Sequence, residues 1–360
     1  METFNDNKRL IELRIIQDDA ESILSLMQTE HDAVFQMAIL PYYALFIQSI
    51  QEYFDKQLIT DDWVGKIKDI RNYIKIFGDS FGKSKNRINM VDADQNNFFQ
   101  SKLRFAFLGH WNIHYNIGTY WINDKHMIGN TQMYSDYLGV KAEENDKEKV
   151  RKQFIDLGYQ CGYVVSSIKT VLSDIIIPPS IERAIVSTKI EYYFDLNTNK
   201  LRKIFIGNNK ELNIFFMNLV SNMNFVKFVL VPMFKGFNPW IFRVEYVVTY
   251  NTYKALKRLK SHSENNSDIC IDLDKLKVVL KLADNLFPEK FRNCMMHYGL
   301  DDKLILQSIN IKNPLYEIIG INFGGNDVNE YYSKLRQFGD TVVQYLESNF
   351  QMNMINLQKL

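Results

Sequence analysis

The segment LFPEKFRNCMMHYGL (286–300) holds the residues whose types and spacing are best suited to chemistry. Arg292 and His297 are separated by four residues, and the polar Asn293 directly follows the arginine. Histidine titrates near neutral pH and can take or donate a proton, whereas arginine stays charged and presents a planar fork that suits phosphate. Cleavage of RNA by its own 2′-hydroxyl needs proton transfer and charge stabilisation, but no metal ion. The segment therefore suits metal-independent RNA cleavage, with Arg292 on the scissile phosphate and His297 as acid or base.

A long helix is predicted over 273–298 and would carry this motif, with helices at 239–262 before it and 326–351 after it. Asn293 lies four residues before His297, so on a continuous helix the two side chains share a face. The amide of Asn293 is then placed to orient the imidazole or to bond the phosphate. Each residue also has a structural alternative: a salt bridge or helix cap for Arg292, a carbonyl-bonded position for His297, and solvent for Asn293.

The motif resembles the HEPN superfamily, whose signature is an Arg and a His separated by four to six residues, commonly with Asn, Asp or His after the Arg. The likeness covers roughly residues 210–360 well and 30–175 in outline. It implies a helical bundle and an endoribonuclease without a cofactor that spares DNA, because DNA lacks the 2′-hydroxyl. It also implies RNA as a partner, an antitoxin or regulatory protein as a second partner, and a role in phage (antiviral) defence, toxin–antitoxin systems or stress responses.

A weaker copy of the motif lies in the first half, where NNFFQSKLR (96–104) resembles DNLFPEKFR (284–292). Arg104 and His110 are separated by five residues, but Phe105 replaces the polar residue and His114 is a rival for His110. Arg104 and His110 are therefore weaker catalytic candidates, for which structural roles are favoured. HEPN domains usually pair across one cleft, so the resemblance implies either an intramolecular pseudo-dimer or a homodimer.

The predicted fold is mainly α, with two helical-bundle HEPN-like halves and a small β-hairpin between them. The N-terminal half is 1–179, the hairpin or linker is 180–208, and the C-terminal half is 209–360. The hairpin rests on an alternating stretch at 188–206 around the turn-prone Asn197-Thr198-Asn199. Apolar periodicity predicts the other helices at 8–28, 31–57, 62–77, 95–120, 146–175 and 210–230.

The net charge is only +1, so any contact with RNA must come from local clusters of Lys and Arg. The RNA-binding candidates on the predicted motif helix are Lys275, Lys277 and Lys281, together with Tyr298, which either stacks on a base or packs in the core. Three further clusters are each more typical of a solvated helix surface when taken alone. They are Lys66, Lys68, Arg71 and Lys75; Lys83, Lys85 and Arg87; and Lys254, Lys257, Arg258 and Lys260.

Other features narrow the class of protein. The cysteines Cys161, Cys270 and Cys294 are odd in number and far apart, which suits a reducing compartment and predicts a cytoplasmic protein without a disulfide framework or metal site. No membrane span, nucleotide-binding loop or cofactor site is predicted. The competing functions are a non-catalytic HEPN-like RNA-binding or protein-assembly module and a helical scaffold unrelated to HEPN.

Overall fold

The computed structural model describes residues 2–78, 80–101, 115–123, 125–139, 141, 147–175, 181–184, 192–199, 209–266, 269, 271–301, 309–323 and 328–349. The weaker motif residues Arg104 and His110, and the rival His114, lie outside the described residues. Cys270 lies outside them as well.

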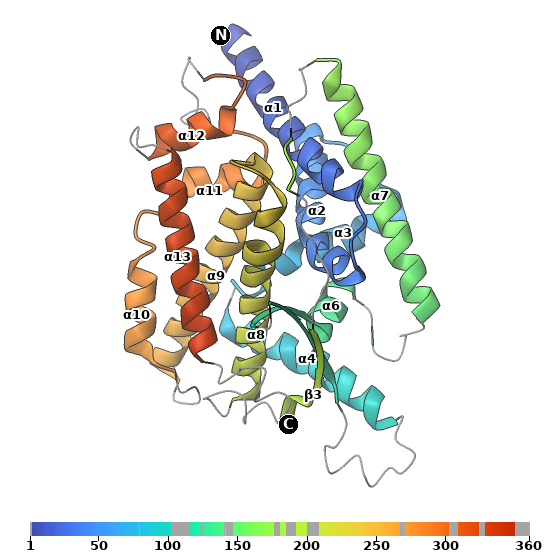
Figure 1. The fold of residues 1–360 in the computed structure, drawn as a ribbon, viewed down its shortest axis with the longest axis vertical. Helices are drawn as coiled ribbons and strands as arrows, with labels where there is room; N and C mark the ends of the chain where they lie inside the picture. The colour runs from blue at the N-terminus through green and yellow to red at the C-terminus, as the bar shows by residue number, and fades with distance from the viewer. Residues whose placement is uncertain are drawn as a thin grey trace.

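Helices make up most of the described chain, so the prediction of a mainly α fold is confirmed (Figure 1). The first half contributes α1 (Glu2–Met27), α2 (Ala33–Phe54), α3 (Asp61–Ile76), α4 (Phe81–Ser101), α6 (Thr131–Leu138) and α7 (Lys147–Ser173). The second half contributes α8 (Lys210–Asn224), α9 (Pro239–Asn265), α10 (Leu273–Lys281), α11 (Glu289–Met296), α12 (Pro314–Asn322) and α13 (Val328–Ser348). A π-helical turn (Phe225–Leu230) and a 3-10 turn (Val231–Met233) extend α8.

Short polar side chains placed directly before apolar stretches start several of these helices. The Asp32 carboxylate accepts a hydrogen bond from the Phe35 amide at 2.8 Å and begins α2. Asn238 accepts from the Ile241 amide at 2.9 Å, and Pro239 occupies the first position of α9, where its missing N–H costs nothing. These caps explain why the helices begin close to where the sequence pattern places them.

The strands differ from the prediction. β1 (Ile117–Ile122) pairs antiparallel with both β2 (His126–Asn130) and β3 (Tyr192–Leu196), giving the order β2-β1-β3. The end of the helix predicted at 95–120 is therefore strand β1, whose β-branched and aromatic residues favour extended backbone. The stretch predicted as a hairpin does supply strand β3, but its partner is β1, and residues 200–208 lie outside the described residues.

The elements pack in three groups, as Figure 1 shows: α1–α3 with α7 on one side, α8 and α9 in the centre, and α10–α13 on the other side. The sheet packs against α8 near one end. One hydrophobic cluster runs through both predicted halves. Buried polar pairs also join them, including Asn130 to Asn218 at 2.8 Å and Lys210 to Asp92 at 2.6 Å. The two predicted halves thus share one continuous core.

The two resembling stretches have different conformations. Residues 96–101 continue α4 as regular helix, whereas 284–288 form a turn before α11. The sequence likeness between them therefore does not extend to the backbone in the part of the chain that the structure describes.

Two helical segments, Ala33–Phe54 and Lys210–Met233, are long and apolar enough to cross a membrane by length and composition. In each, 78 % of the apolar window is buried inside the fold. Core helices have the same length, composition and burial, so these segments carry no argument for a membrane.

Candidate functional site

The helix that was predicted to carry the motif is broken in two. α10 ends at Lys281 and α11 begins at Glu289, with a turn at 282–288 between them. Asn285 has a left-handed backbone with φ of 69°, and Pro288 supplies the residue before α11. Proline disfavours helical conformation in the residue before it and lacks an N–H for the helix ladder. The prediction of one continuous helix at 273–298 is therefore wrong, and the motif sits on a short helix of eight residues.

His297 lies just after this short helix, not within it. Its backbone is extended, with φ of −138° and ψ of 159°, and its amide donates to the Asn293 carbonyl at 2.9 Å. Because the chain turns here, the side chains of Asn293 and His297 do not share a helical face. The expectation that Asn293 orients the imidazole is therefore wrong. The Asn293 side chain accepts from Arg292 instead, and His297 is paired with Glu52.

A buried ionic network holds the end of α11 from beneath. The Arg243 guanidinium pairs with Asp19 at 3.0 Å and donates to the carbonyls of Cys294 at 3.1 Å and His297 at 3.4 Å. The last carbonyls of a helix lack partners within it, so this arginine supplies a C-terminal cap. Arg243 thereby fixes the backbone that presents His297.

Tyr298 belongs to the same buried network. Its side chain is 3 % exposed, and its hydroxyl donates to Asp19 at 2.7 Å. The Arg243 guanidinium also lies over its ring, 4.4 Å from the centroid. A ring so enclosed has no face for a base, so the prediction that Tyr298 stacks on RNA is wrong, and the core-packing alternative holds.

Arg292 lies on the outer side of α11, with a side chain that is 30 % exposed. Its Nε and Nη2 donate to the Asn293 side-chain oxygen at 3.2 and 2.7 Å, and its Nη1 donates to the Tyr250 hydroxyl at 3.2 Å. A guanidinium has five N–H donors. These bonds engage three of them, and Glu289, whose carboxylate lies 3.6 Å from Nη2, is a further anionic neighbour. Asn293 and Tyr250 thus orient the fork, and the 81 % exposed Glu289 side chain is free to give way to a phosphate.

His297 is paired with a carboxylate from the first half of the chain. Its Nδ1 lies 3.1 Å from Glu52 Oε2, and the two side chains are 44 % and 42 % exposed. A carboxylate partner favours the tautomer in which Nδ1 carries the proton, so Nε2 is the nitrogen that accepts one. Glu52 comes from α2, 245 residues away, and no pattern near the motif points to it.

The charges around this pair set its protonation. Burial lowers the pKa of His297 below 6.5, the nearby Lys75 and Arg71 lower it further, and Glu52 opposes them. Burial alone raises the pKa of Glu52, but the hydrogen bond from Gln48 and the positive charges of His297 and Arg71 outweigh it, so the pKa lies below its ordinary value. At neutral pH the pair is therefore mainly a neutral imidazole beside a carboxylate.

Arg71 and Lys75 lie near His297, and Lys75 also lies near Lys254 and Arg292. Burial lowers the pKa of Lys75, and the positive charges of Arg71, Lys254 and Arg292 lower it further, while Glu52 opposes them. Lys75 is thus close enough to both Arg292 and His297 for their charges to interact. We call this group the Arg292–His297 surface, formed by Glu52, Arg71, Lys75, Lys254, Arg292 and His297. It draws on α2, α3, α9 and α11 and combines two basic clusters that look like ordinary solvated helix faces in the sequence.

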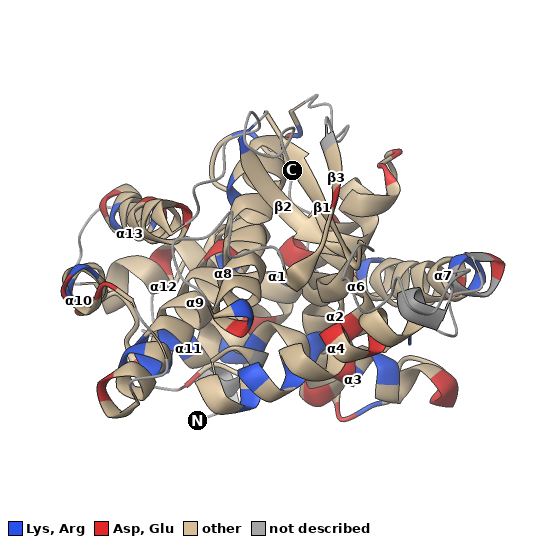
Figure 2. Cartoon of the chain, turned by 90° about the horizontal axis from the view of Figure 1, so that it is seen from below, with Lys and Arg blue, Asp and Glu red and all other residues tan. Residues whose placement is uncertain are grey.

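The lysines predicted for RNA binding lie elsewhere, on α10. Lys275 donates to Ser348 at 2.8 Å and Lys277 lies 3.4 Å from Asp274, while Lys281 ends the helix. No contact joins them to Arg292 or His297 within the described residues. Figure 2 shows Lys and Arg interspersed with Asp and Glu over the helices.

Metal ligation and thiol chemistry find no support in the described residues. Among them, no group of three or more His, Cys, Asp or Glu side chains is placed to hold a metal ion. Cys161 and Cys294 are buried, and burial raises the pKa of each thiol to about 12. A thiol with such a pKa is a poor nucleophile at neutral pH.

No protein-family profile, curated protein or solved structure matches the chain.

Proposed function

We propose that this protein is a metal-independent endoribonuclease that cleaves RNA by attack of the 2′-hydroxyl. One observation supports it most directly: Arg292 and His297 are both partly open to solvent, and both lie in the same cationic cluster with Lys75. Had this pair been sealed among apolar side chains, no polynucleotide could reach it. The resemblance of the motif to the HEPN signature points to the same activity.

Each group has a role in the proposed step. The Nε2 atom of His297 accepts the proton of the 2′-hydroxyl, and Glu52 stabilises the imidazolium that forms. The 2′-oxygen bonds to phosphorus, and the bond from phosphorus to the 5′-oxygen breaks. The leaving 5′-oxygen takes a proton from water. The products are a 2′,3′-cyclic phosphate and a 5′-hydroxyl end.

Arg292 and Lys75 supply the electrostatic part of catalysis. The two N–H donors of Arg292 that Asn293 and Tyr250 leave open suit a bidentate contact with the phosphate oxygens, which would take the place of the exposed Glu289 carboxylate. Lys75 adds a second positive charge where negative charge develops in the transition state. Because Lys75 lies in the same chain, the proposal needs one motif only, whichever way Arg104 and His110 are arranged.

The test uses the full chain and a mixed-sequence RNA containing single-stranded and hairpin segments, in excess EDTA. Wild type should cleave and leave 2′,3′-cyclic phosphate ends, while Arg292→Ala and His297→Ala should each cleave about 10²-fold more slowly or worse. The matched control is His126→Ala, because His126 also pairs with a glutamate, Glu347, at 3.1 Å. It should retain activity to within about twofold.

Three results would count against the proposal. Cleavage abolished by EDTA would indicate a metal-dependent enzyme or a contaminant. Cleavage retained in both motif variants would remove Arg292 and His297 from the chemistry. RNA bound by wild type without any cleavage would favour the competing function, a non-catalytic RNA-binding module.

A further inference from the structure

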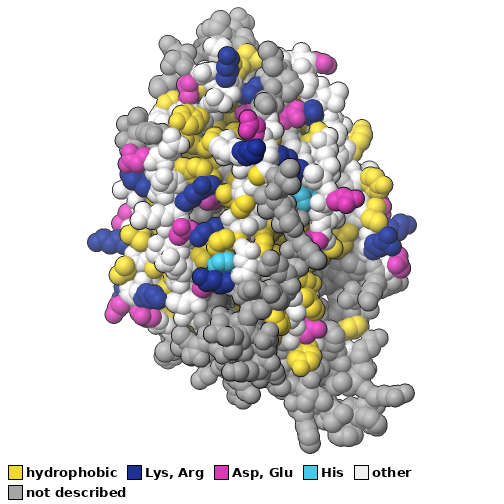
Figure 3. Space-filling view, in the orientation of Figure 1, with side chains coloured by type: hydrophobic (Ala, Val, Ile, Leu, Met, Phe, Trp, Pro, Cys, Tyr) yellow, Lys and Arg dark blue, Asp and Glu magenta, His cyan; other side chains and the backbone are white. Residues whose placement is uncertain are grey.

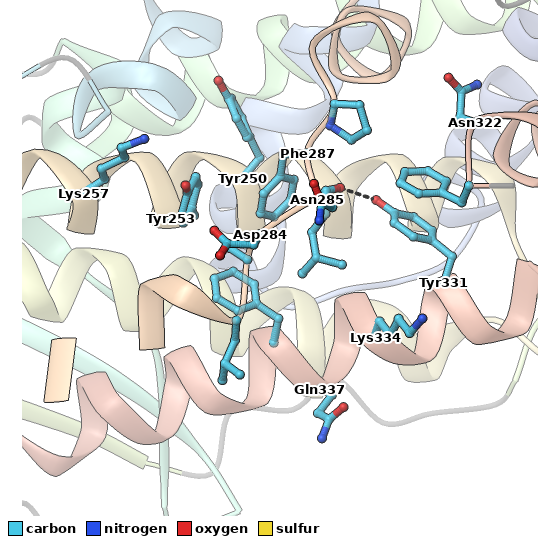
Figure 4. A pocket seen from close by; sticks show the side chains of 16 residues that line it. Tyr250, Tyr253, Lys257, Asp284, Asn285, Phe287, Asn322, Tyr331, Lys334 and Gln337 are labelled. Carbon is cyan, nitrogen blue, oxygen red and sulfur yellow. Dashed lines mark hydrogen bonds between the residues drawn. The ribbon is translucent and has the colours of Figure 1, made fainter. Parts of the chain in front are cut away.

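A large cavity lies beside the Arg292–His297 surface. It has a volume of about 1030 Å³ and opens between α9, the turn at 282–288 and α13 (Figure 4). Natural ligand pockets typically measure about 300–1,000 Å³, so this one has room for a nucleotide-sized group. Six aromatic side chains line it: Tyr250, Tyr253, Phe287, Phe323, Tyr331 and Phe338.

These rings are braced by one another and by hydrogen bonds. Tyr253 stacks on Phe287 with centroids 5.4 Å apart, and Phe323 stacks on Tyr331 at 3.7 Å. The Tyr331 hydroxyl donates to the Leu286 carbonyl at 2.8 Å, which ties α13 to the turn. Tyr331 and Phe338 are buried, at 3 % and 2 % exposure, so they support the wall from behind. The half-buried rings of Tyr250, Tyr253, Phe287 and Phe323 are the ones that a flat ligand can reach. Rings braced in this way lose little conformational entropy when a ligand stacks on them.

Polar groups accompany the rings. The amides of Asn285 and Asn322 line the cavity and offer both donors and acceptors. Lys257, at the rim, places its ammonium 5.9 Å from the Tyr253 ring centroid. Figure 3 shows apolar side chains between Lys and Arg over the face of the molecule that Figure 1 presents. Asp284 and Lys334 line the cavity as well, so its lining carries one carboxylate and two ammonium groups. A ligand with a flat apolar face, a polar edge and a negative charge near Lys257 would meet complementary groups here.

The cavity and the proposed phosphate site share a residue. Tyr250 lines the cavity, and its hydroxyl accepts the hydrogen bond from Arg292. Pro288 also lines the cavity, and its carbonyl accepts from the Arg292 amide at 2.9 Å. A polynucleotide whose phosphate lies on Arg292 would thus have a neighbouring base at the mouth of the cavity.

We propose that this cavity binds one unpaired nucleobase of the RNA strand next to the scissile phosphate. The proposal rests on the proposed function and deepens it, because a base can enter only after leaving its stack and its partner. Base stacking on aromatic side chains is favourable for every base, and the Asn amides can bond its Watson–Crick edge. The substrate class is therefore single-stranded or looped RNA, and regular duplex is excluded.

Binding of a non-cleavable oligonucleotide tests this without depending on activity. The probe is a fully 2′-O-methylated 12-mer that carries the fluorescent base 2-aminopurine at every third position. Wild type should bind it and quench the fluorescence by stacking. Tyr253→Leu should weaken binding about tenfold and remove most of the quenching, whereas Tyr253→Phe should preserve both. The control is Tyr163→Leu on α7, where the ring is 70 % exposed and far from the cavity lining; it should behave as wild type.

A second variant guards against a folding defect in Tyr253→Leu. Lys257 is exposed on α9, so Lys257→Glu should fold normally and weaken binding several-fold by reversing a rim charge. Unchanged affinity and quenching in both Tyr253→Leu and Lys257→Glu would overturn the proposal, as would equal affinity for a duplex of the same sequence.

Cleavage assays on the same variants separate the two proposals. If both hold, Tyr253→Leu raises KM for single-stranded RNA and leaves kcat within about twofold, whereas His297→Ala lowers kcat and keeps the quenching. Cleavage by wild type with no dependence on Tyr253 would leave the nuclease standing and remove the base pocket. Quenching by wild type that Tyr253→Leu removes, without any cleavage, would leave the pocket standing and remove the nuclease.

Discussion

The described part of the chain contains two imidazole–carboxylate pairs with the same N–O distance but different surroundings. His297 and Glu52 lie 3.1 Å apart and are 44 % and 42 % exposed. His126 and Glu347 also lie 3.1 Å apart, but they are 14 % and 28 % exposed. The His126 ring stacks on Phe228 at 3.8 Å, and Asn224 also donates to Glu347.

The difference shows that a histidine paired with a glutamate is not by itself enough to identify a functional site. His126 connects strand β2 with α13 through Glu347, and the Phe228 ring covers it. Both features are typical of a structural contact. His297 is open, lies among cations, and stands on a backbone fixed by Arg243. Access and surrounding charge therefore make His297 the member of the two that suits the proposed chemistry, and the following predictions test that distinction.

The largest expected effect on stability comes from the support beneath His297. Arg243→Met leaves the buried Asp19 without its ion partner and removes the cap of α11, which should lower the free energy of unfolding by about 3–5 kcal/mol at pH 7.5. Urea denaturation measures this loss. In histidine NMR spectra, the His297 signals should shift while those of His126 stay in place.

The matched control is Arg336→Met, because Arg336 pairs with Glu245 at 3.3 Å but is 43 % exposed. Its loss should be at most about 1 kcal/mol. Equal losses for the two arginine variants would mean that the buried network does not hold the end of α11.

The two histidines should also differ in what their removal costs the fold. His126→Ala loses a stacked ring contact and a partly buried hydrogen bond, which should cost about 1–2 kcal/mol. His297→Ala removes a half-exposed pair and should cost about 0.5 kcal/mol or less. Thermal or urea unfolding of both variants decides this, and the reverse order would contradict the structural role given to His126.

The smallest predicted effect is on the pH dependence of cleavage. The base must be neutral, so the rate should rise with pH through the pKa of His297, which burial holds below 6.5. Glu52→Gln removes a group that raises this pKa and should move the midpoint to lower pH, while Lys75→Met should move it to higher pH, each by at most about one unit.

The same lowered pKa has a consequence for stability. The folded state binds fewer protons at His297 than the unfolded state between the two pKa values. His297 therefore contributes stability that is present above pH 6.5 and is lost as the pH falls through its folded pKa.

The pH–rate profiles of the two variants also give the contradicting outcome. If the midpoints of cleavage rate against pH move the same way in Glu52→Gln and Lys75→Met, a group other than His297 controls the rate.

Much of the helical architecture could be predicted from the sequence, because amphipathic periodicity and capping residues are local signals. The bounds of α2, α3, α7, α9 and α13 lie close to the predicted ranges. Two predicted helices, at 95–120 and 273–298, differ from the structure because apolar content alone does not distinguish helix from strand and does not show where a proline breaks a helix. The β-branched and aromatic residues of β1 form a strand where apolar content alone predicts the end of a helix, and Pro288 interrupts the helix predicted at 273–298.

The site was predictable only in part. Arg292 and His297 stand out by type and spacing, but their partners come from distant segments. Glu52 and Lys75 reach the motif through the packing of α2 and α3 against the second half, and residue-by-residue patterns do not encode such long-range contacts. For Tyr298 the sequence leaves base stacking and core packing open, and the structure decides for the core because the hydroxyl donates to the buried Asp19 in α1.

The shortness of α11 has one more consequence. Its first turn begins at the aromatic cavity, through Pro288, and its last turn ends at the carbonyls held by Arg243. Its eight residues span little more than two helical turns between these two places. Only this short helix therefore separates the backbone at Pro288, which lines the cavity, from the backbone that presents His297.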